Sequence, residues 1–420
     1  MSSFRSHVGG AFVMLAVCVG ATVDAMAADV LVVAQTKSEY DGPTLAIRQS
    51  ETIAVKNGKV ITERADSSQT VAAQINTHKP AAVVVLRSVE GDDVKGTVAT
   101  ANAARHQTVV DTFNGVADLE VAKMSIIELP AEDPAVLAAK AHGAEVTIVT
   151  VSATKNPLSL QSRVMRHVVR NTLASQGMID AAVSPDLLLA KKDGLLNVGV
   201  YDGGGSARSP GPNSFTKILS PMPGVQFTPI GPAEIQDGNL AAQLDVLLVP
   251  GGSGSGQAKA MGAAGTQNIR SFIENGGGYV STCAGTYLAT NGYDWSLKVI
   301  NLNTLDRKHW KRGKGDVQIE FTEDGKKLIG GADGLVTVLY ANGPLLGPAE
   351  SPDLPGFKTL AYFRSDMAKN GAPSGIMPNT PAIVAGEFGK GRVICFSPHP
   401  EYTDGLGYLI ERAVLWSAQK

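Results

Sequence analysis

Short apolar runs alternate with helical patterns in the first half of the chain. Apolar side chains recur every three or four positions from Val164 to Leu173, which is typical of an amphipathic helix. Three other segments are apolar, partly β-branched runs of the kind found in buried strands: Val30–Val33, Ala82–Leu86 and Val146–Val151. The alternation predicts a smaller α/β or α+β domain over residues 28–190.

A tight hairpin is also expected in this half. The segment Ile53–Ile61 contains the pair Asn57-Gly58, whose residues tolerate the positive φ angles that a two-residue turn requires. We therefore predict that two neighbouring strands meet at this turn.

The second half repeats strand and helix more regularly. It follows the polar stretch Ala190–Gly194, and we expect a second domain over residues 195–420. Its rhythm predicts an α/β fold with a doubly wound, mostly parallel, flavodoxin-like sheet, in which reactive groups gather beyond the carboxyl ends of the strands. The expected strands and helices are Leu195–Asp202, Ser214–Leu219, Val225–Ile230, Val246–Pro250, Thr266–Glu274 and Tyr279–Thr282.

Residues 1–27 have the pattern of a secretory signal peptide. A short basic start precedes the apolar run Ala11–Val23, and the small-residue sequence Ala25–Ala27 suits cleavage. The run is shorter than the ~20 residues that a transmembrane helix needs. We expect a periplasmic or secreted protein. The alternative is a lipoprotein anchored at Cys18, which the bulky Val17 before it disfavours.

Charge and composition narrow the class of partner. The chain has 37 basic and 39 acidic residues, a net charge of −2, and 44% hydrophobic residues. Such a balance provides no long-range field for nucleic acid or an anionic membrane, so we expect neither as a partner, and no later segment predicts a membrane span. A small-molecule or peptide substrate fits better. The oligomeric state stays open.

Cysteine usage points to one residue. If Cys18 leaves with the signal, only Cys283 and Cys395 remain, which is too few for a disulfide scaffold. One bridge between them is an alternative on counting alone. However, Cys395 lies within the apolar strand Val393–Phe396, where a cysteine acts as a small buried hydrophobe. A free thiol at Cys283 then requires a functional explanation.

The segment Thr282–Gly285 follows a predicted strand directly and opens a helix, which is the arrangement of a nucleophile elbow. Its small neighbours allow a sharp turn, and the helix N-terminus favours the thiolate of Cys283. The alternative is a structural cysteine that merely precedes a helix.

A second motif, Ser397–Glu401, follows a predicted hairpin of Ala382–Phe388 and Arg392–Phe396. At a strand end, His399 would accept the thiol proton, and Glu401 would orient the imidazole ring. Taken separately, His399 is more simply a loop histidine, and Glu401 is more simply an exposed acid. The elbow makes a triad of the three residues the preferred hypothesis.

The third motif is Gly251-Gly252, at the end of its own strand. Glycine lets backbone N–H groups approach a developing oxyanion, and the N–H of Ala284 would supply a second donor. We name Ser253 and Tyr287 as candidate substrate-binding residues. The alternatives are a flexible loop or a phosphate-binding one, but no Gly-Lys-Ser/Thr follows.

With these motifs in this order, residues 195–420 resemble the class I glutamine amidotransferase-like superfamily, and most closely the biotin-protein-ligase N-terminal domain family. The resemblance rests on Val249–Gly254, on Gly277–Val280 running into Cys283–Ala289, and on Tyr340–Pro344. It implies an amidotransferase-like fold, with Cys283 as nucleophile, His399 as base and acid, and Glu401 as the residue that orients it.

The resemblance does not extend to a glutaminase or a ligase. Thr286-Tyr287 stands where glutaminases carry a glutamine, and no ligase or biotin-adenylate motif is recognisable in the rest of the chain. No cofactor is needed by the expected chemistry. His106, His142 and His167 are isolated from one another, which favours surface or core residues over metal ligands, so we expect no metal.

The basic run Arg307–Lys314 is expected to be a solvated loop, with an anion-binding role as the alternative.

The motifs and the signal pattern together lead to two functional hypotheses. The first is an exported hydrolase that cleaves an amide or related acyl bond through a thioester at Cys283. The second is an inactive amidotransferase-like protein that binds or scaffolds a partner through its N-terminal domain.

Overall fold

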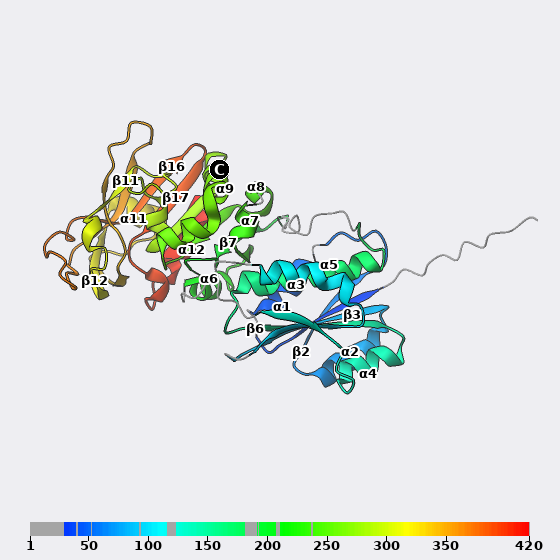
Figure 1. Ribbon diagram of the computed structural model, residues 1–420. Helices are drawn as coiled ribbons and strands as arrows, with labels where there is room; N and C mark the ends of the chain where they lie inside the picture. Colours follow the sequence, from blue (N-terminus) through cyan, green and yellow to red (C-terminus); the bar gives the residue numbers. More distant parts are fainter. Residues whose placement is uncertain are drawn as a thin grey trace, which may run out of the picture.

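The computed structural model describes residues 29–38, 41–51, 53–91, 94–115, 123–180, 191, 193–206, 211–236 and 238–419. The predicted signal segment lies outside the described residues. Figure 1 shows one sheet with its helices in the N-terminal half and a second, larger sheet in the C-terminal half. No helix within the described ranges is long and apolar enough to cross a bilayer.

The N-terminal half is an α/β unit with helices on both faces of a six-stranded sheet. Strand β4 runs antiparallel to β6, and the other neighbouring strands are parallel. Along the sheet the order is β2 (Val60–Ala65), β1 (Val30–Gln35), β3 (Ala82–Val89), β6 (Glu145–Ser152), β4 (Gly96–Thr100) and β5 (Met124–Ile127).

Alternation of side chains along the buried strands supplies two separate cores. Val30 and Val32 pack with α1 (Gly42–Ser50), α3 (Ala103–Asn114) and α5 (Leu158–Ser175) on one face. The intervening residues, such as Leu31, pack on the other face. That face is covered by α2 (Ser68–His78) and α4 (Pro134–Ala141).

The predicted hairpin at Asn57-Gly58 is wrong. Gly58 does have the positive φ of a turn, at 67°. However, the segment before it is not a strand, and β2 pairs in parallel with β1. Ile53 packs against the core, and the N–H of Lys56 donates to the carbonyl of Met178 at 2.8 Å. The apolar residues before the turn therefore belong to the segment that connects α1 to β2, and this segment packs against the core.

The C-terminal half has an α/β fold built on a nine-stranded sheet. Its strands are parallel from β8 through β7, β9 and β10 to β17, and antiparallel from β17 through β16, β15 and β12 to β13. The parallel strands are β7 (Leu196–Tyr201), β8 (Val225–Ile230), β9 (Val246–Val249), β10 (Gly278–Thr282) and β17 (Gly391–Phe396). The others are β12 (Lys314–Phe321), β13 (Leu335–Ala341), β15 (Phe357–Phe363) and β16 (Pro381–Phe388).

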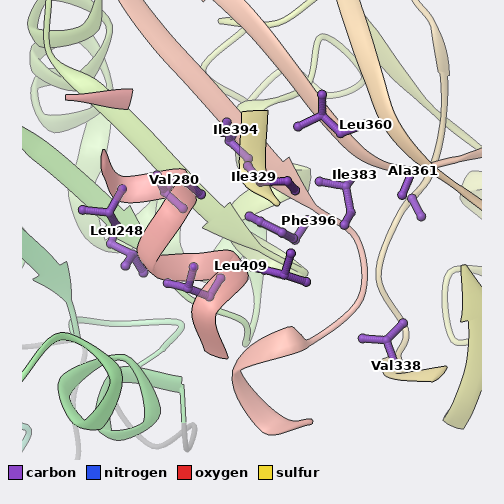
Figure 2. Close-up of a cluster of buried hydrophobic side chains, with 14 of the residues drawn as sticks. Leu248, Val280, Ile329, Val338, Leu360, Ala361, Ile383, Ile394, Phe396 and Leu409 are labelled. Carbon is purple, nitrogen blue, oxygen red and sulfur yellow. The ribbon is translucent and has the colours of Figure 1, made fainter. Parts of the chain in front are cut away.

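Helices cover both faces of the parallel strands. All residues of β9 and β10 are buried, as expected for strands between two helical layers. Figure 2 shows part of one core, where Leu409 lies with Leu248 and Val280. The helices are α6 (Gly211–Leu219), α7 (Pro232–Gln236), α8 (Leu240–Gln243), α9 (Gly254–Glu274), α10 (Ala284–Ala289), α11 (Glu323–Ile329) and α12 (Gly407–Ser417), and β11 (Leu302–Leu305) pairs with β14 (Leu345–Pro348) in a separate small sheet.

Helix α9 begins earlier than predicted, at Gly254 rather than at Thr266. The Ser253 side chain caps it by accepting a hydrogen bond from the N–H of Gly256 at 3.2 Å. At Gly262 the φ of 66° and ψ of 179° interrupt the helix with a kink. Part of the glycine-rich segment is therefore helical rather than loop.

The two halves touch where α5 begins. The N–H of Ser159 donates to Oδ2 of Asp202, the residue after β7, at 2.8 Å. Nearby, Nη2 of Arg166 lies 3.5 Å from Oε1 of Glu234. All four residues are buried. The N-terminal half thus contacts the carboxyl edge of the parallel strands, where the candidate site is expected.

The buried Asp202 at this contact predicts a pH dependence. Burial raises the pKa of its carboxyl to about 7, the charge on Glu234 also raises it, and the hydrogen bond from Ser159 lowers it. An unfolded aspartate has a pKa of about 3.9, so the folded protein binds more protons between about pH 4 and pH 7. Stability therefore falls as pH rises through this range, and Asp202→Asn should remove this contribution. Urea unfolding of both proteins should show that the free energy of unfolding of the variant, relative to that of the wild type, rises by a few kcal/mol from about pH 4 to pH 8.

Asp245 provides a control of opposite sign at the other end of the parallel strands. Burial raises the pKa of Asp245, but hydrogen bonds from Lys191 and Asn197 lower it by a larger amount, so the net shift is downward. Asp245→Asn should cost more stability at neutral than at acidic pH. The same pH dependence for both variants would contradict the assignment of Asp202.

Candidate functional site

Cys283 occupies a strained turn between β10 and α10. Its φ of 46° and ψ of −102° lie in a region that L-residues rarely adopt. Its N–H donates to the carbonyl of Phe396 on the neighbouring strand at 2.8 Å. A Cβ on Gly285 would lie 2.3 Å from the carbonyl oxygen of Val249, so only glycine fits after the turn. The backbone thus has the predicted elbow geometry.

His399 and Glu401 lie beside this turn, on the segment that follows β17. Nδ1 of His399 is 2.8 Å from Oε1 of Glu401, and both side chains are at most 5% exposed. The hydroxyl of Thr282 donates to the same carboxylate oxygen at 2.9 Å. The acid is therefore held by the residue that precedes the cysteine, and it fixes the orientation of the imidazole ring.

The surroundings of His399 favour its protonated form. Burial lowers the pKa of His399, but Cys283 and the Glu401 carboxylate, through charge and hydrogen bonding, raise it more, to about 10. An imidazolium beside a thiolate is the protonation state in which a cysteine is nucleophilic. The ring of Tyr402 stacks on His399 with centroids 4.9 Å apart, which limits its rotation.

Cys283 is 7% exposed, and its Sγ lies 3.4 Å from the carbonyl oxygen of Ala341. That oxygen belongs to the end of β13, which turns sharply at Asn342, with a φ of 57°. A Cβ on Gly343 would lie 2.0 Å from the carbonyl oxygen of Ser397, so this turn packs directly on the histidine segment. The Tyr340–Pro344 motif therefore forms one wall around the thiol.

The Gly251-Gly252 loop forms another wall. A Cβ on Gly251 would lie 2.9 Å from Cε1 of His399 and 3.5 Å from Cβ of Cys283. Gly252 has a φ of 135°, and a Cβ there would lie 2.0 Å from the carbonyl oxygen of Gly205. Side chains at these positions would collide with the candidate site or with its support. The oxyanion-hole role of Gly251, Gly252 and Ala284 stays a prediction.

The two candidate substrate-binding residues lie at different parts of the site. Ser253 is exposed, and its side chain caps α9. Tyr287 lies one turn after Cys283 on α10, is half-buried, and donates its hydroxyl to the carbonyl of Asn342 at 3.2 Å. Their roles in binding stay predictions.

Sequence reasoning missed Thr282 and Tyr402 as parts of the site. Both stand next to named residues, but only the fold shows that Thr282 reaches Glu401 and that Tyr402 covers His399. The predicted absence of a bridge is confirmed, since Cys283 and Cys395 are both free thiols. Among the described residues, no group of three or more His, Cys, Asp or Glu side chains is placed to hold a metal ion.

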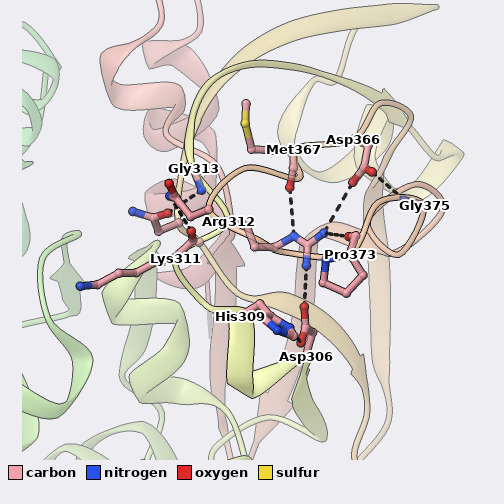
Figure 3. Close-up of polar contacts among 12 residues, drawn as sticks. Asp306, His309, Lys311, Arg312, Gly313, Asp366, Met367, Pro373 and Gly375 are labelled. Carbon is pink, nitrogen blue, oxygen red and sulfur yellow. Dashed lines mark hydrogen bonds and ion pairs between the residues drawn. The ribbon is translucent and has the colours of Figure 1, made fainter.

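The basic run Arg307–Lys314 is not simply a solvated loop. Arg312 is 1% exposed, and Figure 3 shows its guanidinium enclosed by polar partners. Nη1 pairs with Asp306 at 2.6 Å, Nε donates to the carbonyl of Met367 at 3.0 Å, and Nη2 lies 3.8 Å from Asp366. The prediction was wrong for Arg312 because most of its partners, Asp366, Met367 and Pro373, come from a distant part of the chain.

The family match lies within the C-terminal half. Residues 196–310 match the family described as "Biotin-protein ligase, N terminal". The matched range includes Gly251 and Cys283 but ends before His399. The resemblance to this family that the motifs predicted is thereby confirmed for these residues.

A curated relative is the biotin–protein ligase of Schizosaccharomyces pombe, which is 24% identical over 227 residues. The match covers 50% of this chain and 34% of the relative, so the chain spans about a third of the ligase's length. Solved structures that are similar include a glutamine amidotransferase (20% identity, 51% of this chain and 98% of that chain, TM-score 0.34). Another is a putative ThuA-like protein from Parabacteroides merdae (12% identity, 54% and 90%, TM-score 0.38).

The burial of Arg312 predicts a large effect of its removal. Arg312→Met removes the guanidinium that pairs with Asp306 and lies near Asp366, and breaking a buried pair in this way costs about 3–5 kcal/mol. Chemical unfolding of the variant should show this loss. Lys311→Met, at an exposed neighbouring position, should change stability by less than about 0.5 kcal/mol. Equal effects of the two substitutions would contradict a structural role for Arg312.

Proposed function

We propose that this protein is an exported cysteine hydrolase that cleaves an amide or related acyl bond through Cys283, His399 and Glu401. The observation that carries the proposal is the position of the His399 ring, which lies 2.8 Å from the Glu401 carboxylate and, with Cys283, packs against Gly251. The fold of the C-terminal half is amidotransferase-like, and the reaction, the export and the residue roles are proposals.

In the first step, the thiolate of Cys283 attacks the carbonyl carbon of the substrate. A bond forms between sulfur and carbon, and the imidazolium of His399 gives its proton to the departing amine or alcohol as the bond to it breaks. The product of this step is a thioester on Cys283. Glu401 keeps its charge throughout and stabilises the imidazolium before the proton moves.

In the second step, the neutral imidazole takes a proton from water, and the hydroxide oxygen bonds to the thioester carbon. The carbon–sulfur bond breaks, which releases the acid and restores the thiolate and the imidazolium. In both steps the carbonyl oxygen becomes negative. We propose that N–H groups of the Gly251-Gly252 loop and of Ala284 stabilise it, because the loop packs against both His399 and Cys283.

Hydrolysis is preferred to ammonia transfer or ligation for two reasons. An exported enzyme, as the signal pattern predicts, would be separated from cytoplasmic ATP. Moreover, water is the only second reactant that the two-step scheme requires. The ligase activity named for the curated relative describes that longer protein.

An inactive binding or scaffold protein is the second candidate. It is favoured by the 7% exposure of Cys283 and by the 3.4 Å distance from its sulfur to the Ala341 carbonyl oxygen, because a carbonyl oxygen is an unfavourable neighbour for a thiolate. The N-terminal half, which the family match does not cover, would then recognise the partner.

Thiol reactivity separates the two candidates. An ion-paired Cys283 should be alkylated rapidly by iodoacetamide at mildly acidic pH, whereas an ordinary thiol with a pKa of about 8.5 reacts slowly there. His399→Ala removes the counter-charge and should shift the pH profile towards the ordinary thiol. The measurement is the alkylation rate from about pH 5 to pH 9, with the modified residue located by mass spectrometry.

Cys395 is an internal control in the same experiment. It is fully buried, which raises the pKa of its thiol to about 12, so it should remain unlabelled in the folded protein. Slow labelling of Cys283 that does not depend on His399 would favour the binding protein. Once a substrate is known, full turnover by Cys283→Ser would also contradict the hydrolase.

A further inference from the structure

Three aromatic side chains form a continuous surface after the elbow, here called the aromatic wall: Tyr287, Tyr293 and Trp295. The rings of Tyr287 and Tyr293 have centroids 6.1 Å apart and are tilted by 59°. The rings of Tyr293 and Trp295 stack at 4.6 Å with an angle of 19°. All three residues are half-buried, so each keeps part of its surface open to solvent.

The wall lies next to the candidate nucleophile. The hydroxyl of Tyr287 donates to the carbonyl of Asn342, and Sγ of Cys283 lies 3.4 Å from the adjacent carbonyl oxygen of Ala341. The tyrosine hydroxyl and the sulfur therefore contact consecutive residues of one turn. At the other end of the wall, a Cβ on Gly254 would lie 3.0 Å from the Trp295 ring and 3.1 Å from the carbonyl oxygen of Ala284.

Arg307 places a positive charge on this wall. Its guanidinium carbon lies 4.3 Å from the centroid of the Tyr293 ring, and the residue is exposed. It is the first residue of the short 3₁₀ helix η2 (Arg307–His309). In the part of the chain that the structure describes, this guanidinium has no carboxylate partner, in contrast with the enclosed Arg312.

The acidic residues nearby do not supply that partner. Asp306 already binds Arg312 through Oδ2 and His309 through Oδ1. Asp294, between two residues of the wall, is exposed and forms no ion pair with Arg307 in the described structure. A guanidinium stacked on an aromatic ring keeps its edge N–H groups available, in the planar arrangement that matches two carboxylate oxygens.

We propose that Arg307 is a substrate-binding residue that recognises a carboxylate, so that the substrate is an amide or related acyl compound with a carboxylate some distance from the scissile bond. The Tyr287 and Tyr293 rings lie between that carboxylate and Cys283 and contact the intervening part of the substrate. This inference rests on the proposed function. Its basis is the position of the Arg307 guanidinium, which has no carboxylate partner among the described residues. This group contacts the Tyr293 ring, which in turn contacts the Tyr287 ring beside the nucleophile.

Matched alkylating probes test the inference without a known substrate. Each probe is an iodoacetyl amide of a linear amino acid, glycine, 4-aminobutyrate or 6-aminohexanoate, prepared with a terminal carboxylate and with a terminal carboxamide. The measured quantity is the ratio of the Cys283 alkylation rates of the two forms at each length. The wild type should favour the carboxylate by about tenfold at one preferred length, since a hydrogen-bonded charge is worth about that much.

Arg307→Gln should bring the ratio close to one at every length, and Arg307→Lys should restore only part of it. Lys308→Gln removes a charge from the neighbouring exposed residue and should leave the ratio unchanged. Thermal unfolding of each variant checks that it folds. A wild type without carboxylate preference, or a preference that survives Arg307→Gln, would overturn the inference.

Failure of the proposed function would look different. In that case the carboxamide probes would label Cys283 slowly at acidic pH, with or without His399. The ratio is therefore also measured at about pH 9, where an ordinary thiol reacts. A carboxylate preference that depends on Arg307 at this pH would support the binding site even if the triad proved inactive, and its absence would overturn it.

Discussion

The backbone of Cys283 is the constraint on which the rest of the candidate site depends. A non-glycine residue with a φ of 46° stores strain of about 1–3 kcal/mol, and it persists only where its surroundings hold it. Here the hydrogen bond to Phe396 and the close packing of Gly285 against Val249 hold it. Because both contacts come from neighbouring parallel strands, the central sheet itself fixes the position of the sulfur.

The same sheet also fixes the charges around the thiol. The segment after β17 brings His399 and Glu401 to the edge where β10 ends, and Thr282 joins the acid to the elbow. Gly205 and Ser206 hold the glycine loop in place, through the N–H of Ser253 and the carbonyl of Gly251. Gly205 and Ser206 follow Asp202, the residue that the N-terminal half contacts through Ser159. The nucleophile region is therefore braced by both halves of the chain.

Local patterns in the sequence were sufficient for much of the fold. The strand Val225–Ile230 was predicted at its observed bounds, because apolar and polar residues alternate from Val225 to Thr228, which is a strand pattern. The elbow was found because a cysteine between a buried strand and small residues is an unusual pattern. The wrong hairpin at Asn57-Gly58 shows the limit, since a turn pair does not reveal whether its flanking residues pair with each other.

Long-range contacts could not be predicted from the sequence. Arg312 belongs to a basic run, and its burial depends on Asp366 and Met367, which only the fold brings to it. Thr282 and Tyr402 likewise acquire their roles from contacts across the sheet edge. The order of motifs along the chain pointed to Cys283, His399 and Glu401 as a group, but their charges depend on burial and mutual distance, which the sequence does not contain.

The charge on His399 tests the central claim most directly. An NMR titration of its ring resonances should show an imidazolium that persists well above neutral pH, with a pKa near the value of about 10 that the surroundings impose. In Cys283→Ser the pKa should fall, because the negative sulfur is absent while Glu401 remains. A histidine that is neutral at pH 8 in the wild type and unchanged in Cys283→Ser would contradict a thiolate–imidazolium pair.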